Sequence, residues 1–338
     1  MPAPDEVSDW TRAGVHPVAP GVHRIPLPLP NDGLRAVNVY AITDGESLAL
    51  VDPGWALDVA LTQLRSGLAE LGAEFGDVDR ILVTHAHRDH YTQAVHLRRL
   101  VGTHISLGAG EKPTIDAIMA GDEDGGAQDR LEHLTRLGAE ELLPLLPLPD
   151  APPGTWEAPD RWLTDRTVVR AGGRGLEAVA TPGHTRGHMV FVDDKHDLLF
   201  AGDHVLPSIT PSIAVEPAPQ RLALRDYMDS LRLVRAMPDR MLLPAHGDVT
   251  PSAHARIDQL LEHHDMRLQQ SLLAVSQGCT ASDVARVLRW TRRERHFTDL
   301  GPGDQMLATS ETAAHLDLLV HQGRLRSAIH AGVVRYGS

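Results

Sequence analysis

The chain contains 338 residues, 42% of them apolar and 23% charged, which is enough for one or two globular domains with buried cores. Its net charge of −13 argues against a surface built to hold phosphate backbones, and its single cysteine, Cys279, excludes internal disulfides and multi-cysteine metal sites. No apolar run is long enough to span a membrane, and residues 1–14 lack the apolar core of a signal peptide. We therefore expect a soluble, cytoplasmic protein that does not associate with membranes.

Strands and helices are predicted to alternate in the N-terminal part of the chain. Two β-rich runs, 34–43 and 47–54, are separated by a hairpin signal at 44–46. Residues 58–72 then have helical spacing. A buried strand follows at 80–85, then a helix at 92–102 and a strand at 103–108. This alternation indicates an α/β fold built in layers.

The segment 109–163 interrupts the alternation and is too long for an ordinary connection. It combines the acidic, glycine-rich run 121–126, a helical piece near 127–146 and the proline-rich run 143–154. We interpret 109–163 as a helical insertion or as a lid near a site. The run 121–126 lacks the spaced ligands of an EF-hand, so a solvated loop is expected there.

A change of pattern near residue 250 predicts a domain boundary. Before it, strands resume after 163, and a helix is expected near 221–236. After it come a long helix at 250–278, two short helices and a pair of β runs, which resemble a winged-helix module. We therefore predict a catalytic domain at 1–250 and a C-terminal domain at 251–338. Ten Arg and nine Asp or Glu residues in the tail do not favour nucleic-acid binding and leave a homodimer open.

Four potential metal ligands occur within six residues in the segment His85–His90, which has the pattern H-x-H-x-D-H. Composition predicts only about 0.01 chance matches to this pattern in the chain. His85 and His87 are two apart in extended chain and so point to one side, whereas Asp89 and His90 are expected in the following turn. Neutral imidazoles and carboxylates suit zinc, and also iron or manganese.

Three further candidate ligands follow apolar strand runs: His184, Asp203 and His246. Each comes after a glycine or alanine at the end of its run, so all three are expected at one edge of the sheets. With the four residues above they make five histidines and two aspartates. That number is enough for two metal ions with a bridging carboxylate and open water positions.

These segments, in this order, resemble the metallo-β-lactamase superfamily. The resemblance covers roughly residues 20–250 and rests on "NVYAI…ALVDPG", H-x-H-x-D-H, "TPGHTRGH", "FAGDH" and "PAHGD". It implies an αββα sandwich with a dinuclear site at one edge. The C-terminal extension is similar to one branch of the superfamily, which includes hydrolases of acyl thioesters and single-strand ribonucleases.

The resemblance also implies a role for each ligand. One metal would be held by His85, His87 and His184, the other by Asp89, His90 and His246, with Asp203 bridging them. His87, in place of a glutamate, favours two zinc ions and hydrolase chemistry over the di-iron flavoprotein branch. The chain departs from the family pattern at Tyr91 and Thr92, where many relatives have two glycines, and this predicts a narrower pocket.

The expected activity is hydrolysis by a hydroxide shared between two metals. Asp89 is the candidate catalytic residue, because it would orient this nucleophile and accept its proton. A small-molecule acyl thioester or ester is the favoured substrate, because the charge and the 4% aromatic content do not suit RNA. Single-strand endoribonuclease activity, a nucleic-acid-binding protein with a structural metal and a di-iron redox protein are the alternatives.

Several other residues are weaker candidates. For substrate binding they are Tyr91, Arg186, Trp156 and Trp162, and apolar residues of the insertion suited to covering an acyl chain are Leu142, Leu143, Leu145 and Leu146. His188 is either a plain strand residue or a partner of the metal ligands. His263, His264 and Arg267 lie either on a solvated helix face or within reach of the site.

Overall fold

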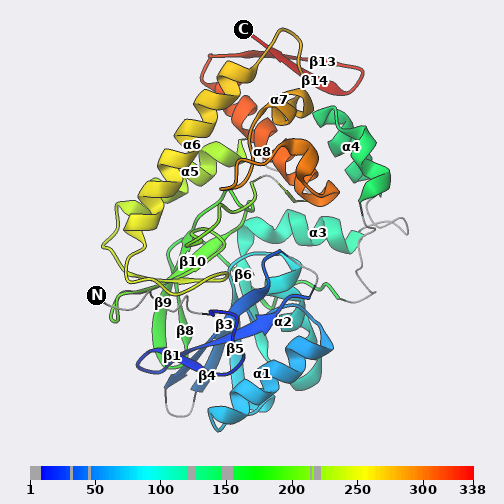
Figure 1. Ribbon diagram of the computed structural model, residues 1–338. Coiled ribbons are helices and arrows are strands. Elements are labelled where there is room, and N and C mark those ends of the chain that lie inside the picture. Colours follow the sequence, from blue (N-terminus) through cyan, green and yellow to red (C-terminus); the bar gives the residue numbers. More distant parts are fainter. Residues whose placement is uncertain are drawn as a thin grey trace.

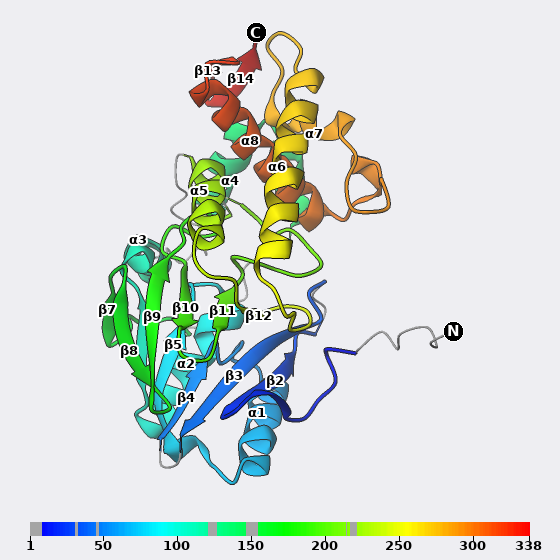
Figure 2. The same ribbon diagram turned by 90° about the vertical axis from the view of Figure 1, so that its left-hand side faces the viewer.

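Two β-sheets stacked face to face form the centre of the computed structural model, with helices on both outer faces and a helical C-terminal region at one end (Figure 1 and Figure 2). The structure describes residues 9–30, 33–44, 47–120, 127–146, 155–213, 215–216 and 222–338. The αββα sandwich that the sequence predicted is therefore confirmed, and it sets the edge at which the candidate ligands meet.

The first sheet has seven strands in chain order: β1 (His16–Ala19), β2 (Val22–Pro28), β3 (Ala36–Asp44), β4 (Ser47–Val51), β5 (Val78–Val83), β6 (His104–Gly108) and β7 (Arg161–Leu163). Its strands are antiparallel up to β4 and parallel from β4 to β7. The second sheet has the order β12-β11-β10-β9-β8, from β8 (Thr167–Ala171), β9 (Arg174–Ala180), β10 (Met189–Asp193), β11 (Leu198–Gly202) and β12 (Met241–Pro244).

Successive side chains of a strand pack on opposite faces of its sheet, and this forms the interior of the sandwich. In β10, Met189 and Phe191 belong to the apolar cluster between the two sheets, while Val190 and Val192 belong to the cluster under the helices. Successive side chains of a strand point to opposite faces, so a strand covered on both sides must be apolar at every position. All five residues of β10 are buried, and the first four are apolar, as this arrangement requires. The fifth, Asp193, ends the strand and pairs with Arg174 and His196.

Helices α1 (Asp58–Glu70) and α2 (Arg88–Val101) cover the first sheet, with the short η1 (Phe75–Asp77) between them, and α5 (Ala223–Arg235) covers the second. The helices predicted at 58–72 and near 221–236 are thus confirmed. The predicted start of α2 at residue 92 was wrong, because the helix begins at Arg88. Asp89 therefore lies in the first turn, where a carboxylate is favoured by the helix dipole.

The described part of the segment 109–163 contains helices, and two of them, α4 (Ala127–Leu137) and η3 (Glu140–Leu145), pack against the C-terminal region. The segment also contains η2 (Ala109–Glu111) and α3 (Lys112–Ala120). Leu134, Leu137 and Leu142 are buried in one cluster with residues of the C-terminal helices. Leu142 is therefore a core residue, and the expectation that it covers an acyl chain was wrong. The predicted loop at 121–126 lies outside the described residues.

The C-terminal region consists of α6 (His254–Ala274), α7 (Ala281–Val287), η4 (Phe297–Asp299), α8 (Pro302–His321) and the hairpin of β13 (Arg326–His330) with β14 (Val333–Gly337). Of the two helices expected to be short, α8 is long, with 20 residues. One apolar cluster includes residues of α5, α6 and α8, so the boundary near residue 250 stays a prediction. Among the helices of the described residues, none has the length and apolar character needed to cross a bilayer.

Candidate metal centre

The seven predicted ligands come together at one edge of the sandwich. His85 and His87 follow β5, Asp89 and His90 open α2, and the loop after β9 carries His184. The ends of the parallel strands β11 and β12 place Asp203 and His246 beside them. Ligand atoms of these residues form two groups, each with its atoms within 4.8 Å of one another. Segments far apart in the sequence thus converge because their strands end at the same edge.

The first group contains His85, His87, His184 and Asp203. Nε2 of His184 lies 3.2 Å from Nε2 of His85 and 3.1 Å from Nδ1 of His87. It also lies 3.6 Å from Oδ2 of Asp203. Three imidazoles and a carboxylate oxygen at these separations provide four donor atoms around one point, a number that matches a tetrahedral zinc site.

The second group contains Asp89, His90 and His246. Oδ2 of Asp89 lies 3.6 Å from Nε2 of His90 and 3.4 Å from Nε2 of His246. Oδ1 of Asp203 faces the same two nitrogens, at 3.7 Å and 3.4 Å. The two oxygens of Asp203 therefore face different groups, which is the arrangement of a bridging carboxylate.

Hydrogen bonds on the outer side of the imidazoles fix which nitrogen points inward. Nδ1 of His184 lies 2.7 Å from the carbonyl oxygen of Ser212, and Nδ1 of His246 lies 2.7 Å from that of Ala36. A carbonyl can only accept, so each Nδ1 carries the proton and donates it. In the neutral ring, Nε2 then presents its lone pair to the centre. This is how the imidazoles of metal sites are held.

Buried atoms without partners test whether a cation fits. Among the described residues, Nε2 of His90, Nε2 of His246 and Oδ1 of Asp203 are buried and form no hydrogen bond. Buried polar atoms are rarely left unpaired, because each costs about 1–3 kcal/mol. These atoms point at one another, so a cation among them would satisfy all three. The donor set therefore fits a pair of metal ions.

The pKa values of the histidines differ between the two groups. Burial, reinforced by the neighbouring His184, lowers the pKa of His87 to about 3, and burial also lowers the pKa of His85 and of His184. These rings are thus neutral, as metal ligation requires. At His90 burial acts in the same direction, but the carboxylates of Asp89 and Asp52 outweigh it and raise the pKa to about 10. The second group thus favours a positive charge.

Asp52 is a residue of the candidate centre that the sequence interpretation did not single out. Its Oδ2 lies 3.0 Å from Nδ1 of His90 and accepts the hydroxyl of Thr84 at 2.8 Å, while Oδ1 accepts the Thr84 backbone N–H at 2.8 Å. The Thr84 oxygen in turn lies 3.0 Å from Nδ1 of His85. One buried carboxylate therefore orients a ligand of each group. The signal was present, because Asp52 ends a strand in "ALVDPG" as the other site residues do.

His188 lies directly behind the ligands. Its side chain is fully buried, its ring stacks on His85 with centroids 5.1 Å apart, and its Nε2 accepts the backbone N–H of Asp203 at 3.2 Å. Gly202 makes this contact feasible, because a Cβ there would come within 2.8 Å of Nε2 of His188. Of the two alternatives for His188, the structure supports a partner of the candidate ligands.

Glu111, which no sequence pattern marked, links the segment that carries His85 and His87 to the loop that carries His184. Its side chain is fully buried and accepts the hydroxyl of Thr185, while the backbone N–H groups of Ala86 and Gly187 also hydrogen-bond to its carboxylate. Any side chain at Gly187 would clash, since a Cβ there would lie 2.1 Å from the backbone nitrogen of Glu111. Burial raises the pKa of Glu111 to about 8.

Several residues expected to contact substrate are instead buried by packing against other side chains. Tyr91 is fully buried, donates its hydroxyl to the backbone oxygen of Glu157 at 2.7 Å and stacks on Trp156, with centroids 5.6 Å apart. Thr92 is also buried. The prediction that Tyr91 and Thr92 narrow the pocket or contact substrate was wrong, because both are used in packing. Trp156 and Trp162 are partly buried against the core of the first sheet.

Arg186 remains a substrate candidate, because it lies two residues from His184 in the sequence and its side chain is only partly buried. Its backbone N–H donates to Glu216 at 3.4 Å. By contrast, His263 and His264 do not join the ligand groups but form a separate group with Glu311. Of the two alternatives left open for them, reach to the site is not supported, and a solvated helix face does not describe His264, which is fully buried.

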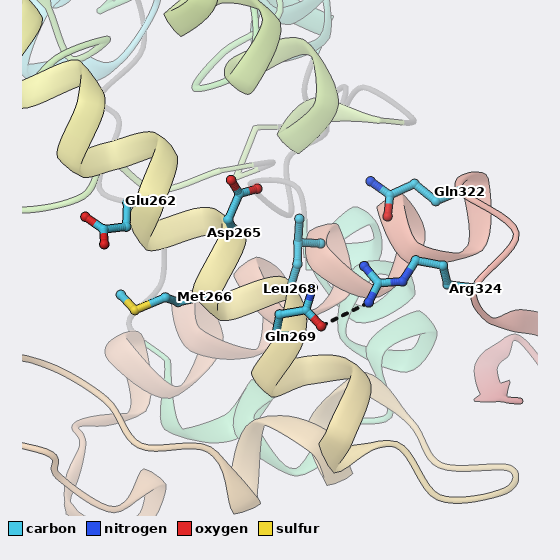
Figure 3. A pocket seen from close by; sticks show the side chains of 7 residues that line it. All are labelled: Glu262, Asp265, Met266, Leu268, Gln269, Gln322 and Arg324. Atoms are coloured by element: carbon cyan, nitrogen blue, oxygen red, sulfur yellow. Dashed lines mark hydrogen bonds between the residues drawn. The ribbon is translucent and has the colours of Figure 1, made fainter.

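A surface groove of about 630 Å³ lies elsewhere, along α6 and the end of α8 (Figure 3). Its lining includes Glu262 and Asp265 of α6 and also Arg324, which donates to Gln269 at 3.1 Å. It contains none of the seven candidate ligands. The groove is thus a feature of the C-terminal region and not of the metal centre.

Solved structures resemble the chain over nearly its whole length. The metallo-beta-lactamase family protein TTHA1429 from Thermus thermophilus is 26% identical, with a TM-score of 0.76 over 94% of this chain and 98% of that chain. A beta-lactamase domain protein from Burkholderia ambifaria is also 26% identical, with a TM-score of 0.72 over 96% and 94%. The likeness therefore extends into the C-terminal helices.

Curated relatives match over a shorter range. The lactamase-like protein nscB of Neosartorya fischeri is 26% identical over 70% of this chain and 56% of its own length. The atrochrysone carboxyl ACP thioesterase AgnL7 of Paecilomyces divaricatus is 35% identical over 52% and 58%. The chain thus spans little more than half the length of these relatives. The family model described as "Metallo-beta-lactamase superfamily" matches residues 32–246, more than half of the chain, and the chain belongs to this superfamily.

Proposed function

We propose that the chain is a dinuclear metal-dependent hydrolase that cleaves an acyl thioester or ester. The observation that carries this proposal is the position of Asp203, whose two oxygens face two separate groups of histidines. A structural zinc site is usually a single ion enclosed by four protein ligands, whereas here seven residues form two adjacent groups that share one carboxylate. Two adjacent metal sites are the arrangement of hydrolases that activate a water between two ions.

Zinc is the proposed metal, since five of the seven donors are imidazoles and the others carboxylates, although this set also accepts iron or manganese. Two such ions would supply a water of lowered pKa and polarise the scissile carbonyl. In this proposal His85, His87 and His184 hold one ion, Asp89, His90 and His246 hold the other, and Asp203 contacts both. Asp52 and His188 keep the ligands oriented.

Asp89 is the proposed catalytic residue. Its Oδ2 lies within 3.6 Å of both histidines of the second group, so its carboxylate borders the point at which the attacking water would sit. The neighbouring histidines, acting against the effect of burial, keep the pKa of Asp89 well below its usual range, so the carboxylate is ionised. The ionised carboxylate can therefore accept a hydrogen bond from the attacking water and orient it. In this proposal it takes the proton only as the water oxygen bonds to the carbonyl carbon, when that proton becomes strongly acidic.

A thioester suits this arrangement because its leaving group needs little assistance. The water oxygen bonds to the carbonyl carbon, the carbon–sulfur bond breaks, and the proton held at Asp89 passes to the departing sulfur or to solvent. A thiol has a pKa of about 8.5, so its thiolate can leave without prior protonation near neutral pH. AgnL7, a relative at 35% identity, is named as a thioesterase of a carrier-protein substrate, which supports the same class.

RNA cleavage has less support. The net charge of −13 and the near balance of charges in the C-terminal region do not supply the basic track that RNA needs. The insertion contributes less to the argument for an acyl chain than the sequence suggested. Of the four leucines singled out there (Leu142, Leu143, Leu145 and Leu146), only Leu145 is largely exposed, at 58%.

The deciding experiment compares kcat/KM for a panel of acyl-CoA thioesters, acyl carrier-protein thioesters and aryl esters with that for single-stranded RNA. The chain is loaded with zinc, and Asp89→Ala serves as the control for contaminating activity. We expect cleavage of at least one acyl substrate by the wild type and none above background by the variant. Efficient cleavage of RNA with all acyl compounds untouched would contradict the proposal.

A further inference from the structure

A second set of potential metal ligands lies between two helices of the C-terminal region. His263 and His264 on α6 and Glu311 on α8 each offer one ligand atom, and these atoms lie within 4.8 Å of one another. His264 is fully buried, while His263 and Glu311 are partly buried. The two helices pack against each other, so the group spans their interface.

Hydrogen bonds define the protonation of His264. Nδ1 of His315 lies 2.7 Å from the backbone oxygen of Glu311, which can only accept, so this nitrogen carries the proton. In the neutral ring, Nε2 of His315 is then an acceptor, and it lies 3.3 Å from Nδ1 of His264. His264 therefore donates from Nδ1, and its own Nε2 bears a lone pair.

No hydrogen-bond donor in the described parts of the chain reaches this lone pair. Among the described residues, Nε2 of His264 is buried and has no hydrogen-bond partner. Burial, followed by the nearby His315 and Arg267, holds the pKa of His264 well below its usual range, so the ring does not gain a proton to resolve the problem. An unpaired buried acceptor destabilises the folded chain, and a bound cation would remove this cost.

In the part of the chain that the structure describes, no cation fully balances the negative charge of Glu311, and burial raises the pKa of its carboxyl group. Arg267 opposes this shift only in part and is engaged elsewhere. It donates to the backbone oxygen of Arg289 at 3.1 Å and lies over the ring of Trp290, 4.3 Å from the centroid. A divalent ion beside Glu311 would offset the cost of its negative charge.

We propose that His263, His264 and Glu311 form a third cation site, selective for a transition-metal ion such as Zn²⁺, that ties α6 to α8. Two imidazoles and one carboxylate are the donors that zinc prefers, and they disfavour Mg²⁺ and Ca²⁺, which select oxygen ligands. A water molecule would complete the coordination, because His263 and Glu311 are partly exposed. The competing state keeps a proton on Glu311 and binds no ion.

The number of zinc ions bound per chain at micromolar free zinc distinguishes the zinc-bound site from the protonated, ion-free site. The chain is compared with His263→Ala, with Glu311→Gln and with the control Glu262→Gln, which lies on the same helix outside the group. We expect the first two variants to hold one ion fewer per chain than the wild type and the control to hold the same number. The kcat should be unchanged in all three, because none of these residues belongs to the proposed catalytic centre. Equal zinc content in all four proteins would overturn the third site.

A second measurement decides the matter independently of these variants and of the catalytic centre. The double variant His184→Ala/His246→Ala removes one ligand from each group of that centre. It should still bind one zinc ion per chain with micromolar affinity, and Glu311→Gln in this background should abolish that binding. A double variant that binds none would overturn the third site, whatever the fate of the hydrolase proposal.

Discussion

Oδ2 of Asp52 lies 3.0 Å from Nδ1 of His90, and this contact turns the other nitrogen of the ring toward the ligand cluster. Asp52 belongs to no ligand group, yet it also holds Thr84, whose oxygen contacts His85. The orientation of both groups thus depends on one buried carboxylate. A centre of this kind is weakened by removing a residue that never touches the metal.

We therefore predict that Asp52→Ala lowers the affinity for the more weakly held zinc ion by about 10- to 100-fold. The loss arises because the ring of His90 can rotate and the backbone N–H of Thr84 loses its acceptor. Competition with a fluorescent zinc chelator measures the affinity. Asp79→Ala, at an exposed position on β5, is the matched control and should bind zinc as the wild type does. An unchanged affinity in Asp52→Ala would contradict the role of Asp52.

The division of the ligands into two groups predicts a pattern of metal loss. His184→Ala and His246→Ala each remove one ligand from a different group, so each should lose one zinc ion per chain relative to the wild type. Asp203→Ala should weaken both, because its two oxygens face both groups. Elemental analysis after desalting measures these differences. Wild-type zinc content in His184→Ala and in His246→Ala would argue against a dinuclear centre.

Asp89→Ala is expected to stay folded but to lose turnover by about 10²- to 10⁴-fold, the usual contribution of a positioned acid or base. The comparison is made with both proteins loaded to the same metal content, so that lost ligation is not mistaken for lost catalysis. Asp116→Ala, on the exposed face of α3, controls for the loss of a carboxylate elsewhere. A correctly metallated Asp89→Ala with near-normal kcat would rule out Asp89 as the catalytic residue.

Glu111 predicts a pH dependence of stability. Burial raises its pKa in the folded chain from 4.5 to about 8, so the folded state binds a proton more firmly than the unfolded state does. The stability that this proton provides is complete below about pH 4.5 and is lost as the pH rises toward 8, with a slope of up to about 1.4 kcal/mol per pH unit.

Glu111→Gln removes the titrating group but keeps its shape. In metal-free protein, the free energy of unfolding in urea should therefore fall less steeply between pH 5 and pH 8 in the variant than in the wild type. Glu140→Gln, at an exposed position, should follow the wild type. Parallel curves for the wild type and Glu111→Gln would show that the carboxyl group of Glu111 is not protonated in the folded chain.

Most of the metal centre could be predicted from the sequence because its ligands follow strands. Each of His184, Asp203 and His246 lies within a few residues of the end of a strand, and strands that end at the same edge bring such residues together. Six residues of chain were enough to identify the segment that begins at His85. The periods of buried strands and amphipathic helices predicted a layered α/β fold, and the resemblance to the superfamily added the αββα sandwich.

Features that depend on side-chain packing could not be read in this way. Tyr91 follows the ligand motif and was expected to shape the pocket, but its ring packs against Trp156, a partner 65 residues further along the chain. Leu142 was expected to cover substrate and instead fills a core shared with the C-terminal helices. Sequence patterns give the polarity of a position, whereas the direction in which its side chain points depends on which elements pack around it.

The sequence by itself therefore determined the layered α/β fold and the candidate ligand residues in their order, because these follow from local pattern and strand ends. The tertiary structure alone decided which residues hold the ligands in place and which acids are buried. Glu111 lies 74 positions before Thr185 in the sequence and meets it only because two tight turns come together. His264 and Glu311 meet only where α6 packs on α8. Hydrogen bonds between residues so distant leave no periodic signal, since nothing local in the sequence requires them.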